Sequence, residues 1–172
     1  MKLVFSLLFA FLLISSCQEQ QKIAYVDNGK VINEYQEKLD IEEKYKVRDE
    51  VFSKRADSIG QAFQLEAQDM QIKARRMSQQ KAQEVYDELG QKQQLLQQQL
   101  QFEQQQLQQA FNSEIDSAII KVKDFVKAYG ERNGYKLILG TTDAASTVMF
   151  GTAEDDLTQI VLDSLNAGYK KD

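Results

Sequence analysis

The central part of the chain carries hydrophobic residues at helical spacing. From about residue 30 to residue 129, apolar positions recur at intervals of three, four and their sums, which is the pattern of an amphipathic helix. In the second half of this stretch the seam follows a repeat of about 3.5 residues, which favours packing against another helix. The seam runs through Ala82, Tyr86, Leu89, Leu96, Leu100, Leu107, Phe111, Ile115, Ala118, Val122 and Phe125.

This stretch is too long to stand as one uncovered helix. At ~1.5 Å per residue it would form a rod of roughly 150 Å whose apolar seam still needs a partner. Folding back covers the seam locally, so we predict an antiparallel coiled-coil hairpin over residues 30–129, with two arms of nearly equal length. Its tip is placed near residues 73–81, where apolar residues are scarce. Because that tip lacks glycine and proline, a continuous parallel coiled coil remains the structural alternative.

The segments on either side of the helical stretch have the composition of strands. Residues 22–27 (KIAYVD) and 135–140 (YKLILG) are rich in β-branched and aromatic residues and adjoin Asn-Gly turns, which predicts two strands. Gly130 is expected to close the helical stretch as its C-terminal cap. Residues 147–151 (TVMFG) are predicted to form a third strand.

A helix is predicted to follow this third strand. The segment from Thr152 has the spacing of a capping box with an acidic first turn. The helix should bury one apolar face, made by Leu157, Ile160, Val161 and Leu165.

The two ends of the chain are therefore expected to form one small body, made of residues 22–29 and 130–172. The predicted fold class is α+β, mostly α, with the long hairpin inserted in this β-containing body. Three short strands and one helix bury little apolar surface, and open strand edges favour association. We expect the body to be the oligomerisation unit, with the following candidate interface residues: Ile23, Tyr25, Leu137, Leu139, Val148 and Phe150.

The N-terminus has the layout of a bacterial export signal. Lys2 precedes an apolar run over residues 3–14, and this run is shorter than the ~20 residues that a transmembrane helix needs. The run ends in Ile-Ser-Ser before Cys17, an order that resembles a lipobox, in which the cysteine is acylated after cleavage. We predict a signal peptide over residues 1–16 and a lipidated tether over residues 17–21; the alternative for the cysteine is an ordinary thiol.

Composition argues against catalysis and against nucleic acid as a partner. The chain contains no histidine, which is the commonest general base and metal ligand, and it has no phosphate-binding loop. No catalytic residue, cofactor or metal site is predicted. The net charge of −5 disfavours binding to phosphate backbones. Proline is also absent, which permits long uninterrupted helices.

Four basic residues gather at the predicted tip: Lys73, Arg75, Arg76 and Lys81. They are either a solvated turn or a contact for anionic lipid or for acidic segments of a bound protein. Gly60 and Gly90 interrupt the two arms, each at a cost of about 1 kcal/mol relative to alanine. They are expected to face each other across the hairpin, either as tolerated residues or as a flexing point.

The order of these segments resembles the Skp/OmpH family of periplasmic chaperones. The similarity lies in KIAYVD directly after an export signal, a proline-free charged hairpin, and then YKLIL and TVMF before DLTQIV. It extends from about residue 22 to residue 166. The resemblance implies a homotrimer with a shared β-containing body, whose three hairpins surround a cavity that holds unfolded outer-membrane proteins without ATP.

Two features depart from familiar members, which are basic and soluble. This chain is acidic and resembles a lipoprotein, which puts in doubt the attraction of clients by a positive cavity. The favoured hypothesis is a non-enzymatic holdase in the periplasm of a Gram-negative bacterium. Gln18 after the lipid cysteine favours anchoring to the outer membrane. The alternative is an adaptor lipoprotein whose hairpin docks on an envelope complex, and an enzyme is the least favoured class.

Overall fold

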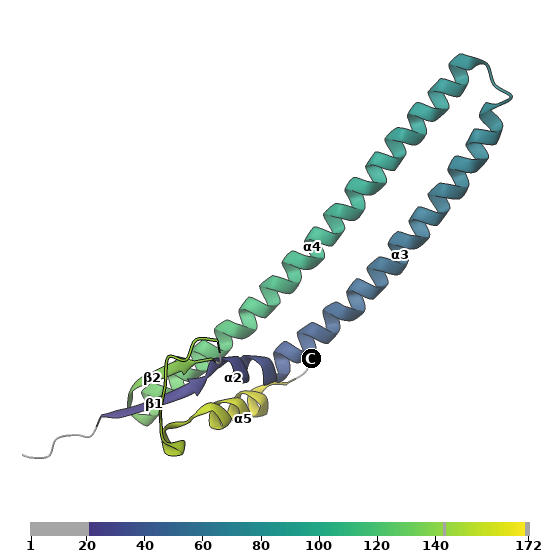
Figure 1. Cartoon of the computed structure of the whole chain (residues 1–172). Coiled ribbons are helices and arrows are strands. Elements are labelled where there is room, and N and C mark those ends of the chain that lie inside the picture. Colours follow the sequence, from purple (N-terminus) through teal and green to yellow (C-terminus); the bar gives the residue numbers. More distant parts are fainter. Residues whose placement is uncertain (1–20, 143, 171–172) are drawn as a thin grey trace, which may run out of the picture.

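The computed structural model, which describes residues 21–142 and 144–170, is a long helical hairpin on a small body (Figure 1). This is the predicted fold class, and it rules out a continuous parallel coiled coil. The elements in chain order are β1 (Lys22–Asp27), α2 (Asn28–Glu34), α3 (Gln36–Ala74), α4 (Gln79–Asn133), β2 (Tyr135–Thr141), the short 3-10 helix η1 (Ala153–Asp155) and α5 (Thr158–Gly168).

The two ends of the hairpin meet in a parallel pair of strands. Ile23 of β1 lies opposite Leu137 of β2, and Ala24 lies opposite Ile138. The segments predicted to form these strands therefore do so, and the connection between them is the entire hairpin. Helices α2, α4 and α5 pack against one face of the sheet, where Ala24 is buried.

The buried core lies in the body and in the base of the hairpin. Its members are Ala24, Val26, Val31, Tyr35, Ile41, Tyr45, Ala118, Val122, Leu157, Val161, Leu162 and Leu165. Beyond Tyr45 on α3, most of the described apolar side chains of the arms are half-buried or exposed. The arms are also unequal in length, with 39 residues in α3 and 55 in α4, because α4 continues into the body.

Helix α4 ends four residues later than expected. Gly130 lies inside the helix and is buried; a side chain there would press on Ile138 of β2 at 3.1 Å. The C-terminal cap is Gly134, whose φ of 70° is left-handed and whose N–H donates to the Gly130 carbonyl. Glycine is favoured in that conformation because it has no Cβ. Both positions thus have a reason for glycine, but the capping role belongs to Gly134.

The predicted strand at residues 147–151 is wrong for the single chain. This segment has no strand structure, and Met149 and Phe150 are both 88% exposed. The outer edge of β1 is already used, since the Leu157 N–H donates to the Tyr25 carbonyl at 2.9 Å. That edge of β1 is therefore not open to pairing with a third strand within the protomer.

The C-terminal helix also differs from its prediction. Residues 153–155 form the 3-10 turn η1, and α5 begins at Thr158. Its predicted buried face is confirmed for Leu157, Val161 and Leu165 but not for Ile160, which is 47% exposed. Leu162 is buried in place of Ile160, because the side of α5 that packs against α2 and β1 contains Leu162.

A break at Tyr35 separates α2 from α3, although no glycine or proline marks it. Tyr35 has extended backbone angles, with ψ at 121°. The side-chain amide of Asn166 in α5 bridges the break: its oxygen accepts from the Gln36 N–H at 2.9 Å, and its nitrogen donates to the Glu34 carbonyl at 3.4 Å. These contacts satisfy backbone groups that the interrupted helix leaves without partners. One amide thereby fixes the direction of the first arm.

We expect Asn166→Ala to lower the free energy of unfolding by about 1 kcal/mol or somewhat more, because a helix cap and a second hydrogen bond are lost. Urea denaturation measures this change, and faster hydrogen exchange at the Gln36 amide would locate it. Asn112→Ala is the matched control, since the Asn112 side chain accepts only an exposed bond from Gln108. An equal effect of both substitutions would contradict the bridging role.

Candidate functional site

One face of the small sheet is apolar and is not covered by the helices of the body. Side chains alternate along strands, so Ile23, Tyr25, Leu137 and Leu139 share the face opposite Ala24. Three of them are well exposed: Ile23 at 47%, Leu137 at 51% and Leu139 at 38%. Four of the six predicted interface residues are thus brought together here.

The segment at residues 147–151 approaches this face without forming a strand. A side chain at Gly151 would collide with the ring of Tyr25, so the segment lies against that ring. Val148 is half-buried and Phe150 points almost fully into solvent. The open sheet face and this segment together form an apolar surface on the body.

The two arms are joined by four ion pairs, named here the ion-pair ladder. Its members are Glu37–Lys121, Lys44–Glu114, Arg55–Glu103 and Glu66–Lys92. Successive pairs are seven, eleven and eleven residues apart on α3 and on α4 alike, so all four lie in one antiparallel register. Steps of seven and eleven together average close to the ~3.6 residues per turn of a straight helix. The ladder therefore fits straighter arms than the predicted 3.5-residue seam.

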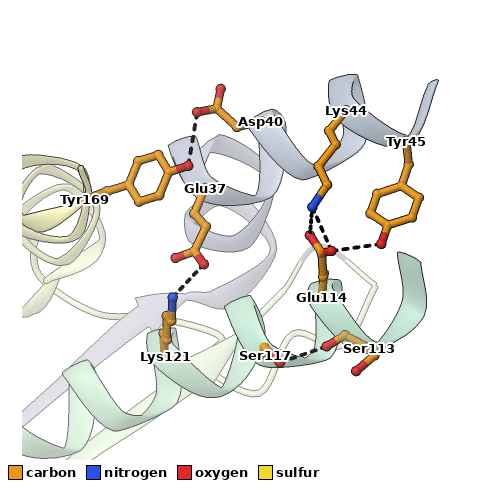
Figure 2. Close-up of polar contacts among 9 residues, drawn as sticks. All are labelled: Glu37, Asp40, Lys44, Tyr45, Ser113, Glu114, Ser117, Lys121 and Tyr169. Carbon is orange, nitrogen blue, oxygen red and sulfur yellow. Dashed lines mark hydrogen bonds and ion pairs between the residues drawn. The ribbon is translucent and has the colours of Figure 1, made fainter. Parts of the chain in front are cut away.

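Glu114 is the centre of the best-connected pair of the ladder (Figure 2). Both of its carboxylate oxygens accept from the Lys44 ammonium at 2.7 Å, and Oε1 also accepts from the Tyr45 hydroxyl at 2.8 Å. These two hydrogen bonds, first that of Lys44 and then that of Tyr45, lower the pKa of Glu114. Burial, followed by the bond to the carboxylate, raises the pKa of Tyr45. Both groups are held in their ordinary charge states, which suits a structural link between the arms.

A second group of polar contacts lies closer to the body. Glu37 accepts from the Lys121 ammonium at 2.6 Å and from the Tyr35 hydroxyl at 2.7 Å. Burial, and then the bond to Glu37, raise the pKa of Tyr35 above its usual range. The Tyr169 hydroxyl, from the end of α5, donates to Asp40 at 3.2 Å (Figure 2).

These contacts line a groove of about 740 Å³ between α3, α4 and α5. Each acid in it accepts hydrogen bonds from a lysine or a tyrosine, so the groove is a polar joint at the base of the arms. Within residues 21–142 and 144–170, no cluster of three histidine, cysteine or acidic side chains could hold a metal ion.

The turn between the arms lies at residues 75–78, inside the predicted tip. Lys73 is paired with Asp69 at 2.6 Å on its own helix. Arg75, Arg76 and Lys81 are exposed. The structure thus brings the four basic residues to one end of the molecule, with one of them already engaged.

Gly60 and Gly90 do not lie at the same level of the hairpin, contrary to expectation. Gly60 lies between the Arg55 and Glu66 positions of the ladder, whereas Gly90 lies on the tip side of Lys92. A side chain at either glycine would meet no atom within 4 Å, so packing does not require glycine at these positions. Their role as a flexing point stays a prediction.

Cys17, the proposed signal peptide and most of the tether lie outside the described residues. Of the helices in the described part, none combines the length and the apolar character that crossing a membrane requires. The ladder and the Asn166 bridge were missed by the sequence analysis. Opposite charges repeating at matched steps along the two arms were a usable signal for the ladder; the bridge had none, because its two halves are 130 residues apart.

Glu114→Gln is expected to cost at most about 1 kcal/mol of stability at neutral pH, since partly exposed ion pairs contribute little. Because the folded-state pKa of Glu114 is lowered, this contribution is present above the unfolded value of ~4.3 and is lost as pH falls through the folded value. The free energies of unfolding of Glu114→Gln and of the unmodified protein should therefore converge in acid. Glu88→Gln, on the same helix and without an ion pair in the described structure, is the control; a pH-independent difference for Glu114→Gln would contradict the assignment.

Comparison with known proteins agrees with the geometry. The model of the OmpH family, described as outer membrane protein (OmpH-like), matches residues 22–165. A crystal structure of a candidate outer membrane chaperone (OmpH-like) from Caulobacter crescentus CB15 has the same fold, with a TM-score of 0.75 at 13% identity over 88% of this chain and 87% of that one. No curated protein sequence gives a match. Since the family model spans both strands, the whole hairpin and most of α5, the chain belongs to the OmpH-like family.

Proposed function

We propose that this protein is a periplasmic holdase chaperone, which binds unfolded outer-membrane proteins without ATP. The observation that carries the proposal is a hairpin projecting from a small body with large apolar side chains exposed along both arms. Leu65 is 68% exposed on α3, and Leu95 and Phe102 are 64% and 60% exposed on α4. Large apolar side chains exposed along both arms offer an unfolded client apolar surface to bury. Membership of the OmpH-like family supports the same role.

A holdase acts by mass action rather than by chemistry. Binding to the unfolded state of a client lowers the concentration that is available to aggregate. Clients differ in sequence, so many weak contacts along two arms suit this task better than one closed pocket. The polar contacts at the base of the hairpin hold the arms in place, while the outer surfaces of the arms remain available to a client.

The open sheet face supports assembly into a homotrimer. Ile23, Leu137 and Leu139 expose an apolar surface in the single chain, and the nearby Met149 and Phe150 are even more exposed. A second copy would cover this surface. Strand pairing between copies would also give residues 147–151 the backbone hydrogen bonds of a strand, which they do not form in the protomer. Three hairpins around a common axis would then enclose a space for the client.

We expect the purified protein to sediment as an elongated trimer and to suppress aggregation of an unfolded outer-membrane β-barrel protein, at one trimer per client and without nucleotide. Leu137→Lys should yield monomers and lose most of the protection, because the charge would be buried in the subunit interface. Light scattering and sedimentation velocity measure the two effects.

Ile160→Lys is the matched control for this variant. Ile160 is an exposed apolar residue of the body that lies on α5 rather than on the sheet. The Ile160→Lys variant should keep the mass of the trimer and its suppression of client aggregation unchanged. A trimer that gives no protection would reject the holdase and leave an adaptor whose hairpin docks on an envelope complex.

We also propose that Cys17 carries the lipid that anchors the protein to the outer membrane. More than one acyl chain gives stable membrane binding, and an anchored body would place the basic tips within reach of a second acidic surface. Arg75 and Arg76, both exposed at the turn, would then contact anionic lipid headgroups, at about 1 kcal/mol for each basic residue near the surface.

Membrane association should separate into two steps. Cys17→Ser is expected to release the protein from the membrane fraction of cells. In that background, Arg75→Glu with Arg76→Glu should lower binding to anionic liposomes at low salt roughly tenfold or more, because two attractive charges become repulsive. Unchanged liposome binding would contradict the role of the tip, and unchanged fractionation of Cys17→Ser would contradict the lipid anchor.

A further inference from the structure

Building on the proposed holdase function, we propose that only one face of each hairpin binds clients, and that it takes extended segments combining apolar and acidic side chains. This face is the side that carries the ion-pair ladder, named here the ladder face. Its centre is a groove between residues 47–55 of α3 and residues 103–110 of α4. The opposite side is named the glutamine face.

Three exposed apolar residues of α3 form a stripe beside the ladder. Val47, Val51 and Leu65 are 50%, 61% and 68% exposed, and their spacings of four and fourteen residues place them on one side of the helix. Val47 follows Lys44 by three positions and Val51 precedes Arg55 by four. Residues at these spacings are neighbours on a helix surface, so the stripe lies on the ladder side.

Helix α4 carries an apolar stripe of its own. Leu95, Phe102 and Ile120 are 64%, 60% and 54% exposed and are separated by seven and eighteen residues, which are close to whole numbers of turns. Leu95 follows Lys92 of the ladder by three positions, which places Leu95 next to the ladder as well. Phe102 and Ile120 are each nine residues from Phe111, which contacts α3, and nine residues are about two and a half turns, so both lie on the side of α4 that faces away from α3.

A groove of about 590 Å³ opens on the ladder face, and the stripe of α3 forms part of its wall. It is lined by Val47, Arg48, Val51, Phe52, Arg55, Glu103, Gln106, Leu107 and Ala110. Its apolar floor is open to the side chains of an extended chain, and its rim is charged.

The glutamine face has the opposite character at the same level of the hairpin. Its groove measures about 360 Å³ and is lined by Glu42, Tyr45, Lys46, Asp49, Gln104, Leu107, Gln108 and Phe111. On α4 this side is a continuous row of exposed amides: Gln94, Gln97, Gln101, Gln104 and Gln108. Their spacing of three and four residues places them on one face. A solvated amide surface of this kind gives little gain when an apolar chain covers it.

The charges of the two grooves identify the client chemistry. In the groove on the ladder face Arg55 is paired with Glu103 and Arg48 is a further cation, whereas the groove on the glutamine face holds two acids and one lysine. Arg48 makes no close ion pair within the described part of the chain, and its guanidinium lies 5.0 Å from the centre of the Tyr45 ring. In a chain of net charge −5, this local excess of positive charge complements an acidic segment. The groove can therefore attract acidic segments even though the chain as a whole is acidic.

The test compares two double variants, one on each face of the hairpin. The probes are a fluorescein-labelled peptide of alternating leucine and aspartate and its counterpart of alternating leucine and lysine. We expect the purified protein to bind the acidic peptide at least about fivefold more tightly than the basic one, by fluorescence anisotropy. Val47→Gln with Val51→Gln should weaken binding of the acidic peptide about tenfold, a change typical of losing central apolar contacts.

Gln101→Ala with Gln108→Ala is the matched control on the glutamine face and should change binding less than twofold. Both variants replace exposed helix residues, and circular dichroism should give equal helicity. Equal weakening by the two variants, or no weakening by the first, would overturn the assignment of the face. Equal binding of both peptides would overturn the acidic preference. A lower oligomeric mass of Val47→Gln with Val51→Gln would show that the face is a subunit contact, which also overturns the proposal.

Failure of the holdase function gives a different result from failure of this face assignment. If the unmodified protein suppresses aggregation and Val47→Gln with Val51→Gln suppresses it equally well, the holdase stands and the ladder face is rejected. If the peptide binds as expected but the unmodified protein gives no protection, the site stands as a peptide-binding surface and the holdase is rejected.

Discussion

The parallel pairing of β1 with β2 is the constraint on which the rest of this structure depends. Two parallel neighbouring strands cannot be joined by a tight turn and need a crossover connection. In this protein the crossover is the whole hairpin, from α2 to the end of α4. Because the connection begins and ends at the same sheet, its two halves must run out and back together. The antiparallel register of the arms follows from this closure.

The two arms are held together mainly by polar contacts, which leaves apolar side chains exposed on their surface. The buried core ends near Tyr45 on α3 and Ala118 on α4, and the ion-pair ladder continues the contact toward the tip. Ion pairs fix the register of the arms without using apolar side chains. Each of them contributes only modestly to stability. The large apolar side chains that a conventional core would consume remain exposed on the arms. The register of the arms and their exposed apolar surface thus depend on different residues of the same helices.

The body fixes the direction of the arms and leaves one surface open. Asn166 bridges the break at Tyr35, and Tyr169 reaches Asp40 at the start of α3, so the last helix of the chain holds the first arm in place. The sheet face that carries Leu137 has no such cover. A body that is rigid toward its arms and apolar on its other side suits a subunit of a larger assembly.

The sequence by itself determined the long helices, the two pairing strands and the place of the turn near Arg75. These features rest on local periodicity, composition and turn chemistry, which act between residues close along the chain. It also gave the six interface candidates, four of which share the open sheet face.

Only the tertiary structure decided the remaining features. The break at Tyr35, the inward turn of Leu162 in place of Ile160, and the absence of a strand at residues 147–151 each depend on a partner that is distant in sequence. The two faces of the hairpin arise in the same way. Helical spacing defines a stripe on each arm, but the packing of the two arms decides which residues of a stripe border a groove. Local pattern cannot contain that information, because it is a property of how two helices pack and not of either helix alone.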